Sequence, residues 1–198
     1  MPRTTTSKVT EILNCSISLE HGAIIQYLTH AYLLGESGIG AEIINIARTE
    51  MRHLKYFGDL LVDLGGEPDL FKRGPMFSDA NSAFAMISNG ITAETEAIKA
   101  YEAFCDELDH APAQRIFTRV LTDERFHLAQ FGSFLAPATE LLATYPAVPA
   151  ADTAAPAHAI ALLNGAVSQE YRAILLHVYE HLKSRDFWLR EHTLEAMN

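Results

Sequence analysis

Two helical sequence patterns each occur twice in this chain, and both pairs have the same separation. Residues 20–27 (EHGAIIQY) and 94–101 (ETEAIKAY) share the pattern E-x-x-A-I-x-x-Y. Residues 50–61 (EMRHLKYFGDLL) and 124–135 (ERFHLAQFGSFL) share E-x-x-H-L-x-x-F-G-x-x-L. The step from position 20 to 94 equals the step from 50 to 124, and two separate patterns that agree at one offset indicate an internal repeat. The chain therefore contains a duplicated helical hairpin.

The spacing inside each repeat predicts that its charged residues lie at one level. The first Glu precedes the Glu-x-x-His motif by the same interval in both halves, and the midpoints lie in or beside the breaks GESGIG (35–40) and HAPAQ (110–114). With a rise of ~1.5 Å per residue, each Glu lies about 20 Å from its turn. If a pseudo-two-fold axis relates the hairpins, one layer of the bundle contains Glu20, Glu50, Glu94 and Glu124, with His53 and His127 on the same helix faces.

The neighbours of these residues at helical spacing are apolar, so the layer is expected to be buried. A single carboxylate such as Glu20 could reach solvent from the edge of its apolar stripe. Four buried carboxylates, however, would cost a prohibitive free energy without counter-ions. Two divalent cations would balance the four charges, and a site of oxygen and nitrogen ligands favours iron or manganese. The remaining alternative is a metal-free bundle in which all six residues are structural.

The rest of the chain is also helical in pattern. Apolar residues recur at spacings of three and four through roughly 8–34, 40–64, 80–108, 112–135 and 157–182. We predict an all-α protein with a four-helix bundle over 1–135, an Ala/Pro-rich linker over 136–156 and a C-terminal helical extension over 157–198. Residues 66–79 could span roughly 45 Å when extended, enough for one long crossover along a helix.

Composition excludes several classes of function. The net charge is −10 and no basic cluster occurs, which argues against a nucleic-acid partner. No uncharged run is long enough to cross a membrane, and the N-terminus has no apolar signal segment. The two cysteines, Cys15 and Cys105, fit a reducing cytoplasm and are too few for a Cys₄ metal site of the rubredoxin type. We therefore expect a cytoplasmic protein.

The repeated motifs resemble those of the bacterioferritin and rubrerythrin group of ferritin-like proteins. The likeness covers residues 8–135 and is closest to bacterioferritin through EHGAIIQYLTHAYLL and TEMRHLKYFGDLLVDLGGEPDL. It implies a ferritin-like bundle of two hairpins with one long crossover, assembled as a homo-oligomer of two or more copies. It also implies that the six residues are diiron ligands, with Glu50 and Glu124 bridging the two ions and Glu20 and Glu94 terminal.

The resemblance also implies a function. We expect a diiron protein that binds Fe²⁺ and oxidises it with O₂ or H₂O₂, as a ferroxidase. One alternative is a rubrerythrin-like oxidoreductase that detoxifies peroxide, which would need a separate electron donor because this chain lacks the rubredoxin-like cysteines. Another is a non-enzymatic helical interaction module with a vestigial metal site.

Three further residues are candidates with two interpretations each. Tyr27 and Tyr101 occupy equivalent repeat positions, and they either fill the core or act as phenols that hydrogen-bond a ligand or supply an electron. Met51 directly follows Glu50. In bacterioferritins a methionine at that place binds haem b across a two-fold interface, but haem-free relatives also carry methionine here, and we favour an uninvolved surface or interface methionine.

The C-terminal extension contains a weaker third copy of the first pattern. Residues 170–177 (EYRAILLH) repeat E-x-x-A-I, whereas the chain end, EAMN (195–198), has Asn198 where a histidine would be expected. We interpret this segment as a decayed repeat that serves packing or assembly. The alternative is a second, partial metal site.

Overall fold

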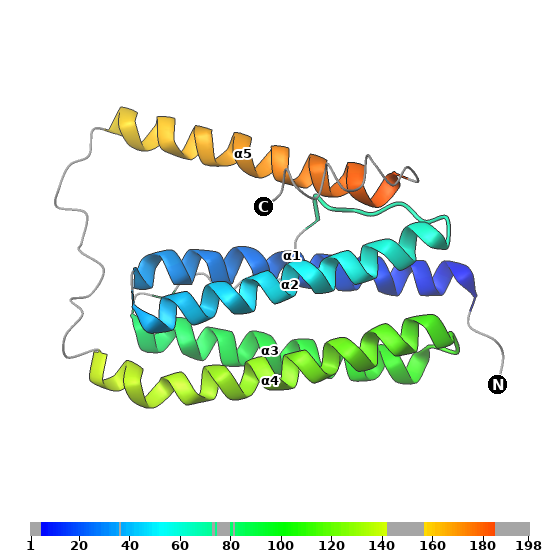
Figure 1. Ribbon diagram of the computed structural model, residues 1–198, viewed down its shortest axis with the longest axis horizontal. Coiled ribbons are helices and arrows are strands. Elements are labelled where there is room, and N and C mark those ends of the chain that lie inside the picture. The colour runs from blue at the N-terminus through cyan, green and yellow to red at the C-terminus, as the bar shows by residue number, and fades with distance from the viewer. Residues whose placement is uncertain are drawn as a thin grey trace. The chain divides into compact units, whose positions relative to one another are not determined.

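The computed structural model describes residues 5–35, 37–72, 74, 80, 82–141 and 157–184. These residues form five α-helices and no strand, which confirms the predicted all-α class (Figure 1). The helices are α1 (Thr6–Leu34), α2 (Gly38–Asp63), α3 (Ala83–Glu107), α4 (Ala111–Leu141) and α5 (Ala157–Lys183). Their bounds follow the predicted ranges closely except in α4, which continues through residue 141 into the segment predicted as linker. Residues 142–156 lie outside the described residues.

A tight turn joins α1 and α2 and makes them antiparallel neighbours. Gly35 ends α1 with a φ of 62°, a backbone conformation that favours glycine. Ser37 caps α2, and its hydroxyl accepts a hydrogen bond from the backbone N–H of Gly40. A Cβ atom on Gly40 would lie 2.7 Å from the carbonyl oxygen of Gly35, so this close approach requires glycine.

The second hairpin has a turn of a different kind. His110 precedes α4, and its Nδ1 accepts a hydrogen bond from the backbone N–H of Ala113. The side chain of Gln114 donates to the carbonyl oxygen of Leu108, 2.6 Å away, and so ties the first turn of α4 to the end of α3. The two predicted hairpins are therefore both present, closed by unrelated local interactions.

The connection from α2 to α3 runs along α1. In Figure 1, α2 and α3 point in the same direction, so the chain must return along the bundle between them. Asn14 fixes the start of this path, because its side chain donates to the carbonyl oxygen of Glu67 and accepts from the N–H of Asp69. Further along, the N–H of Gly74 donates to the carbonyl oxygen of Ser18. Residues 73 and 75–79 of the predicted crossover lie outside the described residues.

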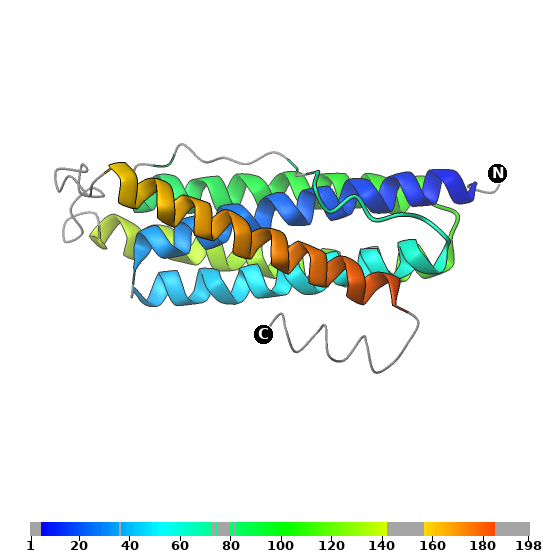
Figure 2. The ribbon, with the colours of Figure 1, turned by 90° about the horizontal axis from the view of Figure 1, so that it is seen from above.

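Each bundle helix packs against two others. The pairs α1–α2 and α3–α4 are the hairpins, and α1–α3 and α2–α4 join the hairpins to each other (Figures 1 and 2). Apolar side chains fill the bundle on both sides of the middle layer. On one side, Tyr27 and Phe131 pack with Ile43, Ile46 and Ile87. On the other, Phe57, Tyr101, Phe104 and Phe117 form an aromatic group with ring centroids 5.0–6.4 Å apart.

The helix α5 belongs to a second compact unit, Pro149–Asn198, distinct from the bundle unit Met1–Val148. Its first half carries no charged residue, and its last turn contains His181 and Lys183, which favour a helix C-terminus when charged. Among the described residues, Glu170 and His177 belong to no cluster of three metal-ligating side chains. Residues 195–198 lie outside the described residues. None of the described helices is long and apolar enough to span a membrane.

Candidate metal centre

The six residues singled out by the repeat come together in the middle of the bundle. Each of the four bundle helices contributes at least one of them: Glu20 from α1, Glu50 and His53 from α2, Glu94 from α3, Glu124 and His127 from α4. All six side chains are buried, with at most 3% of any residue exposed. Ionisable groups of this kind are rarely so deeply buried unless they are paired or coordinate a metal.

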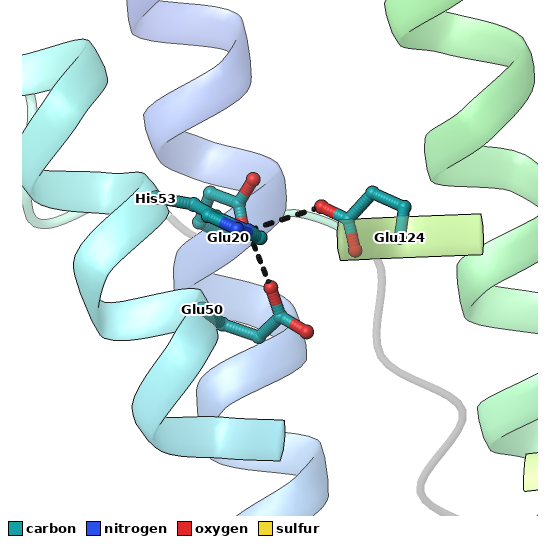
Figure 3. Close-up of side chains that lie close together, drawn as sticks. All are labelled: Glu20, Glu50, His53 and Glu124. Atoms are coloured by element: carbon teal, nitrogen blue, oxygen red, sulfur yellow. Dashed lines mark ion pairs between the residues drawn. The ribbon is translucent and has the colours of Figure 1, made fainter. Parts of the chain in front are cut away.

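Glu50 and Glu124 each face both histidines. His53 Nδ1 lies 2.8 Å from Glu50 Oε2 and 3.2 Å from Glu124 Oε1 (Figure 3). On the other side, His127 Nδ1 lies 2.9 Å from Glu50 Oε1 and 3.3 Å from Glu124 Oε2. Each of the two carboxylates therefore presents one oxygen to each imidazole. That is the geometry required of a carboxylate that bridges two ions.

Glu20 and Glu94 each belong to one side only. Glu20 Oε2 lies 3.8 Å from His53 Nδ1, and Glu94 Oε1 lies 3.9 Å from His127 Nδ1. Two groups of four ligand atoms result, each with all its atoms within 4.8 Å of one another, and they share Glu50 and Glu124. We name them by their histidines. The His53 position comprises Glu20, Glu50, His53 and Glu124, and the His127 position comprises Glu50, Glu94, Glu124 and His127.

The unsatisfied polar atoms fit two cations. Within the described residues, neither carboxylate oxygen of Glu50 accepts a well-aligned hydrogen bond, and His53 Nδ1 likewise makes none. These atoms lie within 4.8 Å of the other polar atoms of their groups. A buried polar atom without a hydrogen bond costs about 1–3 kcal/mol, and a metal ion at the centre would satisfy all of them. Oxygen and nitrogen ligands with a total charge of −4 suit two divalent iron or manganese ions.

Without a metal, four residues of the cluster have raised pKa values and so bind protons more tightly than usual. Burial raises the pKa of the Glu20 carboxyl, and the charge of Glu124 raises it further. Burial likewise raises the pKa of Glu94 well above its usual value, with the charges of Glu124 and Glu50 adding to the effect. For His127, burial lowers the pKa, but contacts with Glu124 and Glu50 outweigh it and raise the pKa to about 9. The same balance raises the pKa of His53. Bound cations would replace these protons.

Both tyrosines bond to a carboxylate of the opposite hairpin. Tyr27 Oη donates to Glu94 Oε1 at 2.6 Å, and Tyr101 Oη donates to Glu20 Oε1 at 2.5 Å. Burial raises the pKa of both phenols well above 10, so they stay protonated as donors. Their rings also pack in the core, Tyr27 against Phe131 at a centroid distance of 5.1 Å. The two tyrosines therefore fill the core and also hydrogen-bond carboxylates of the cluster, while their catalytic role stays a prediction.

Asp123 joins the site although the sequence analysis did not single it out. Its Oδ2 lies 3.3 Å from His53 Nε2, on the far side of the ring from the cluster, and 3.2 Å from Arg119 Nε. The signal that could have found it is its place directly before Glu124, which turns it toward α2 when Glu124 faces the core. A carboxylate in this place fixes the orientation and tautomer of a ligating histidine.

Met51 lies outside the cluster. It is 42% exposed on α2, whereas the preceding Glu50 is 1% exposed, so Glu50 faces the bundle interior and Met51 faces outward. An exposed methionine can serve only a ligand that sits on the bundle surface.

A cavity gives access to the carboxylates from the outside. It has a volume of about 530 Å³ and lies between α1 and α3, where small side chains such as Ala23, Ala93 and Ala97 leave room. All four glutamates of the cluster line it: Glu20, Glu50, Glu94 and Glu124. The four carboxylates of the cluster therefore border a cavity in the bundle.

Several known proteins are similar to this chain in sequence and fold. A family model described as ferritin-like matches residues 13–80. A bacterioferritin of Desulfovibrio desulfuricans is 31% identical over 131 residues, covering 63% of this chain and 73% of the relative. The X-ray structure of a Desulfovibrio desulfuricans bacterioferritin, described as showing its diiron site in different catalytic states, has a TM-score of 0.64 at 31% identity. That match covers 71% of this chain and 85% of the other.

A second solved structure agrees in fold. It is the 2.6 Å structure of Rhodobacter capsulatus bacterioferritin with a metal-free dinuclear site and haem iron in a crystallographic special position. Its TM-score is 0.63 at 24% identity, covering 70% of this chain and 89% of the other. The bundle and its shared carboxylates define a ferritin-like protein with a candidate dinuclear metal centre. Within this class, the chain belongs to the bacterioferritin family.

Proposed function

We propose that this protein binds two iron ions at the six-residue cluster and oxidises Fe²⁺ with O₂ or H₂O₂. The observation that carries the proposal is the division of Glu50 and Glu124 between the two histidines, because it gives two adjacent ion positions with shared ligands. The likeness to a bacterioferritin whose diiron site has been seen in different catalytic states supports iron as the metal.

The chain's own residues have separate parts in this function. Bound iron supplies the one-electron chemistry, and Fe²⁺ is also the substrate. Four buried carboxylates stabilise the added positive charge of Fe³⁺. Tyr27 and Tyr101 hold the terminal carboxylates Glu94 and Glu20 in place by donating to one oxygen of each. The cavity between α1 and α3 supplies the route for ion and oxidant.

The test is a comparison of metal stoichiometry in glutamate variants. Anaerobic titration with Fe²⁺ should give about two ions per parent chain. Glu50→Ala should bind none tightly because both positions lose a ligand, whereas Glu20→Ala should keep the His127 position. Mixing with air, and separately with H₂O₂ without O₂, should give a rise in near-ultraviolet absorbance and identify the oxidant.

Two outcomes would contradict the proposal. A parent protein that binds no iron after reconstitution would leave a structural bundle or interaction module. A His53→Ala/His127→Ala double variant that oxidises Fe²⁺ as fast as the parent would place the chemistry elsewhere. Faster oxidation by H₂O₂ than by O₂ would instead favour the peroxide-detoxifying alternative, for which a separate electron donor must return the iron to Fe²⁺.

We also propose that Met51 binds haem b between two copies of the chain. Its exposed position on α2 supports this, as does the haem in the Rhodobacter capsulatus bacterioferritin. The proposal includes a homo-oligomer of at least two chains.

A further inference from the structure

We infer that the two ion positions are unequal, and that Asp123 makes the His53 position bind its ion more tightly than the His127 position. This inference rests on the proposed function, since it concerns the same dinuclear site. It goes further by assigning an order of binding and a positioning residue that acts through His53. Asp123 itself does not belong to either group of ligands.

The argument begins with a place where the two repeats differ. At the offset that relates the repeats, Asp123 corresponds to Thr49, and Arg119 corresponds to Asn45. In the second hairpin, Arg119 Nε contacts Asp123 Oδ2 at 3.2 Å, and the same oxygen lies 3.3 Å from His53 Nε2. The acidic side chain is thus held between a guanidinium and an imidazole.

The first hairpin has no such carboxylate. The hydroxyl of Thr49 donates to the carbonyl oxygen of Asn45 at 3.3 Å and accepts from Arg52 at 2.7 Å. The side-chain oxygen of Asn45 accepts from Arg48 at 3.3 Å. The equivalent place therefore holds a neutral hydroxyl and amide next to two cationic side chains.

The two histidines consequently differ on the nitrogen that faces away from the cluster. Both aim Nδ1 at the carboxylates, His53 at 2.8 Å and His127 at 2.9 Å from Glu50. His53 Nε2 can donate its proton to Asp123. His127 contacts Glu50, Glu94 and Glu124 through Nδ1 only. Among the described residues, no carboxylate oxygen lies within 4.0 Å of its Nε2.

A carboxylate on the distal nitrogen strengthens a histidine ligand. It fixes the tautomer with the lone pair on the ligating nitrogen, restricts ring rotation and makes that nitrogen a better donor to the metal. Asp123 is 22% exposed on its side chain, so water weakens its charge only in part. Losing such a partner generally lowers metal affinity about 10- to 100-fold. The first ion should therefore enter the His53 position.

The test is calorimetric titration of the full-length protein with Zn²⁺, which requires no oxidant. The parent should bind two ions in two resolved steps. Asp123→Asn should weaken the first step about 10- to 100-fold and leave the second unchanged. His127→Ala should abolish the second step and keep the first. Thr49→Val, the matched change in the other repeat, should alter neither step.

A merely structural role for Asp123 would give a different result. Asp123→Asn would then weaken both binding steps alike, and this result would overturn the inference. A variant in which neither step changes would overturn it as well. Should Asp123→Asn fail to fold, Arg119→Ala keeps the question open to test. It removes the guanidinium that holds Asp123 and should weaken only the first step, by a smaller factor.

The parent titration separates this inference from the proposed function. Two ions bound with equal affinity, in one unresolved step, would contradict the inference and leave two-ion binding intact. Absence of any Zn²⁺ or Fe²⁺ binding would contradict both.

Discussion

The phenol of Tyr101 on α3 donates a 2.5 Å hydrogen bond to Glu20 on α1, so a residue of the second hairpin fixes a buried carboxylate of the first. Tyr27 of the first hairpin likewise donates a hydrogen bond to Glu94 of the second. Glu20 and Glu94 therefore each accept a hydrogen bond from a tyrosine of the opposite hairpin. The alignment of the two hairpins determines the geometry of the metal centre.

Tyr101→Phe is expected to impair the His53 position more than the His127 position. It removes the donor to a buried carboxylate, at a cost of about 1–3 kcal/mol, and keeps the ring that fills the core. Thermal unfolding of the metal-free protein should occur at a lower temperature and Fe²⁺ oxidation should slow, while iron at the His127 position is retained. Tyr32→Phe, at a residue that is 74% exposed, is the control and should change nothing. An unaltered oxidation rate in Tyr101→Phe would mean that the hydrogen bond has no part in the chemistry.

The metal-free protein is expected to lose stability as the pH rises from about 6.5 to 9. The pKa of His127 is raised from 6.5 to about 9, so its stabilising contribution is complete below the unfolded value and disappears as the pH rises through the folded value. The raised pKa values of Glu20 and Glu94 act in the same direction, since the unfolded chain releases those protons more readily. Melting temperatures across this range measure the effect.

Metal binding should remove much of that pH dependence. A bound ion requires deprotonated ligands, so Zn²⁺ uptake at neutral pH should release protons, measurable as a binding enthalpy that varies with the ionisation enthalpy of the buffer.

His127→Gln should flatten the pH dependence of the melting temperature of the metal-free protein between the unfolded and folded pKa values of His127. A parent protein with constant stability over that range would refute the pKa shift of His127.

Gly90→Ala is expected to destabilise the bundle and disturb the site from a distance. An added Cβ would lie 2.5–2.8 Å from ring atoms of Phe131, which packs against Tyr27. Overpacking of this kind costs about 1–3 kcal/mol, more than the helix gains from alanine. Gly132→Ala is the matched control, because nothing lies within 4 Å of its added Cβ. It should stabilise the protein by roughly 0.5–1 kcal/mol. Equal denaturation midpoints for the two variants would contradict this account of Gly90.

Haem binding is expected to depend on Met51. After reconstitution with haem b, the parent should show a Soret band that Met51→Leu lacks, since leucine has no sulfur ligand. Met86→Leu, in the buried core, is the control and should retain the band. A Soret band that survives in Met51→Leu would assign haem to another ligand.

Much of the site could be predicted because the repeat constrains it. The common offset of the two patterns and the equal interval inside each half determine which side chains share a level, and the structure brings together all six. Buried charges also leave a clear signal, since Glu20 and Glu94 interrupt otherwise apolar helix faces. Their roles as metal ligands remain a prediction, as do the domain limits and the role of the C-terminal extension.

Other features depend on contacts between hairpins, which periodicity does not encode. The sequence places Tyr27 two turns beyond Glu20 on the same helix, yet its partner is Glu94 on another helix. Asp123 is one of many acidic residues on a helix surface until α2 and α4 are packed together. The extension of α4 to Leu141 is equally hidden, because Ala and Pro in that segment suggested a linker.

The sharing of Glu50 and Glu124 means that one hairpin alone cannot complete either ion position. Two identical hairpins, arranged as a symmetric dimer, would build the same centre, and any substitution would then appear in both halves. Joining the halves in one chain keeps them together at any protein concentration and lets each mutate independently. Only in such a fused chain can Asp123 face one histidine while Thr49 occupies the equivalent place in the other half. Covalent duplication thus allows the two ion positions to differ in their surroundings, which a homodimer of identical hairpins could not achieve.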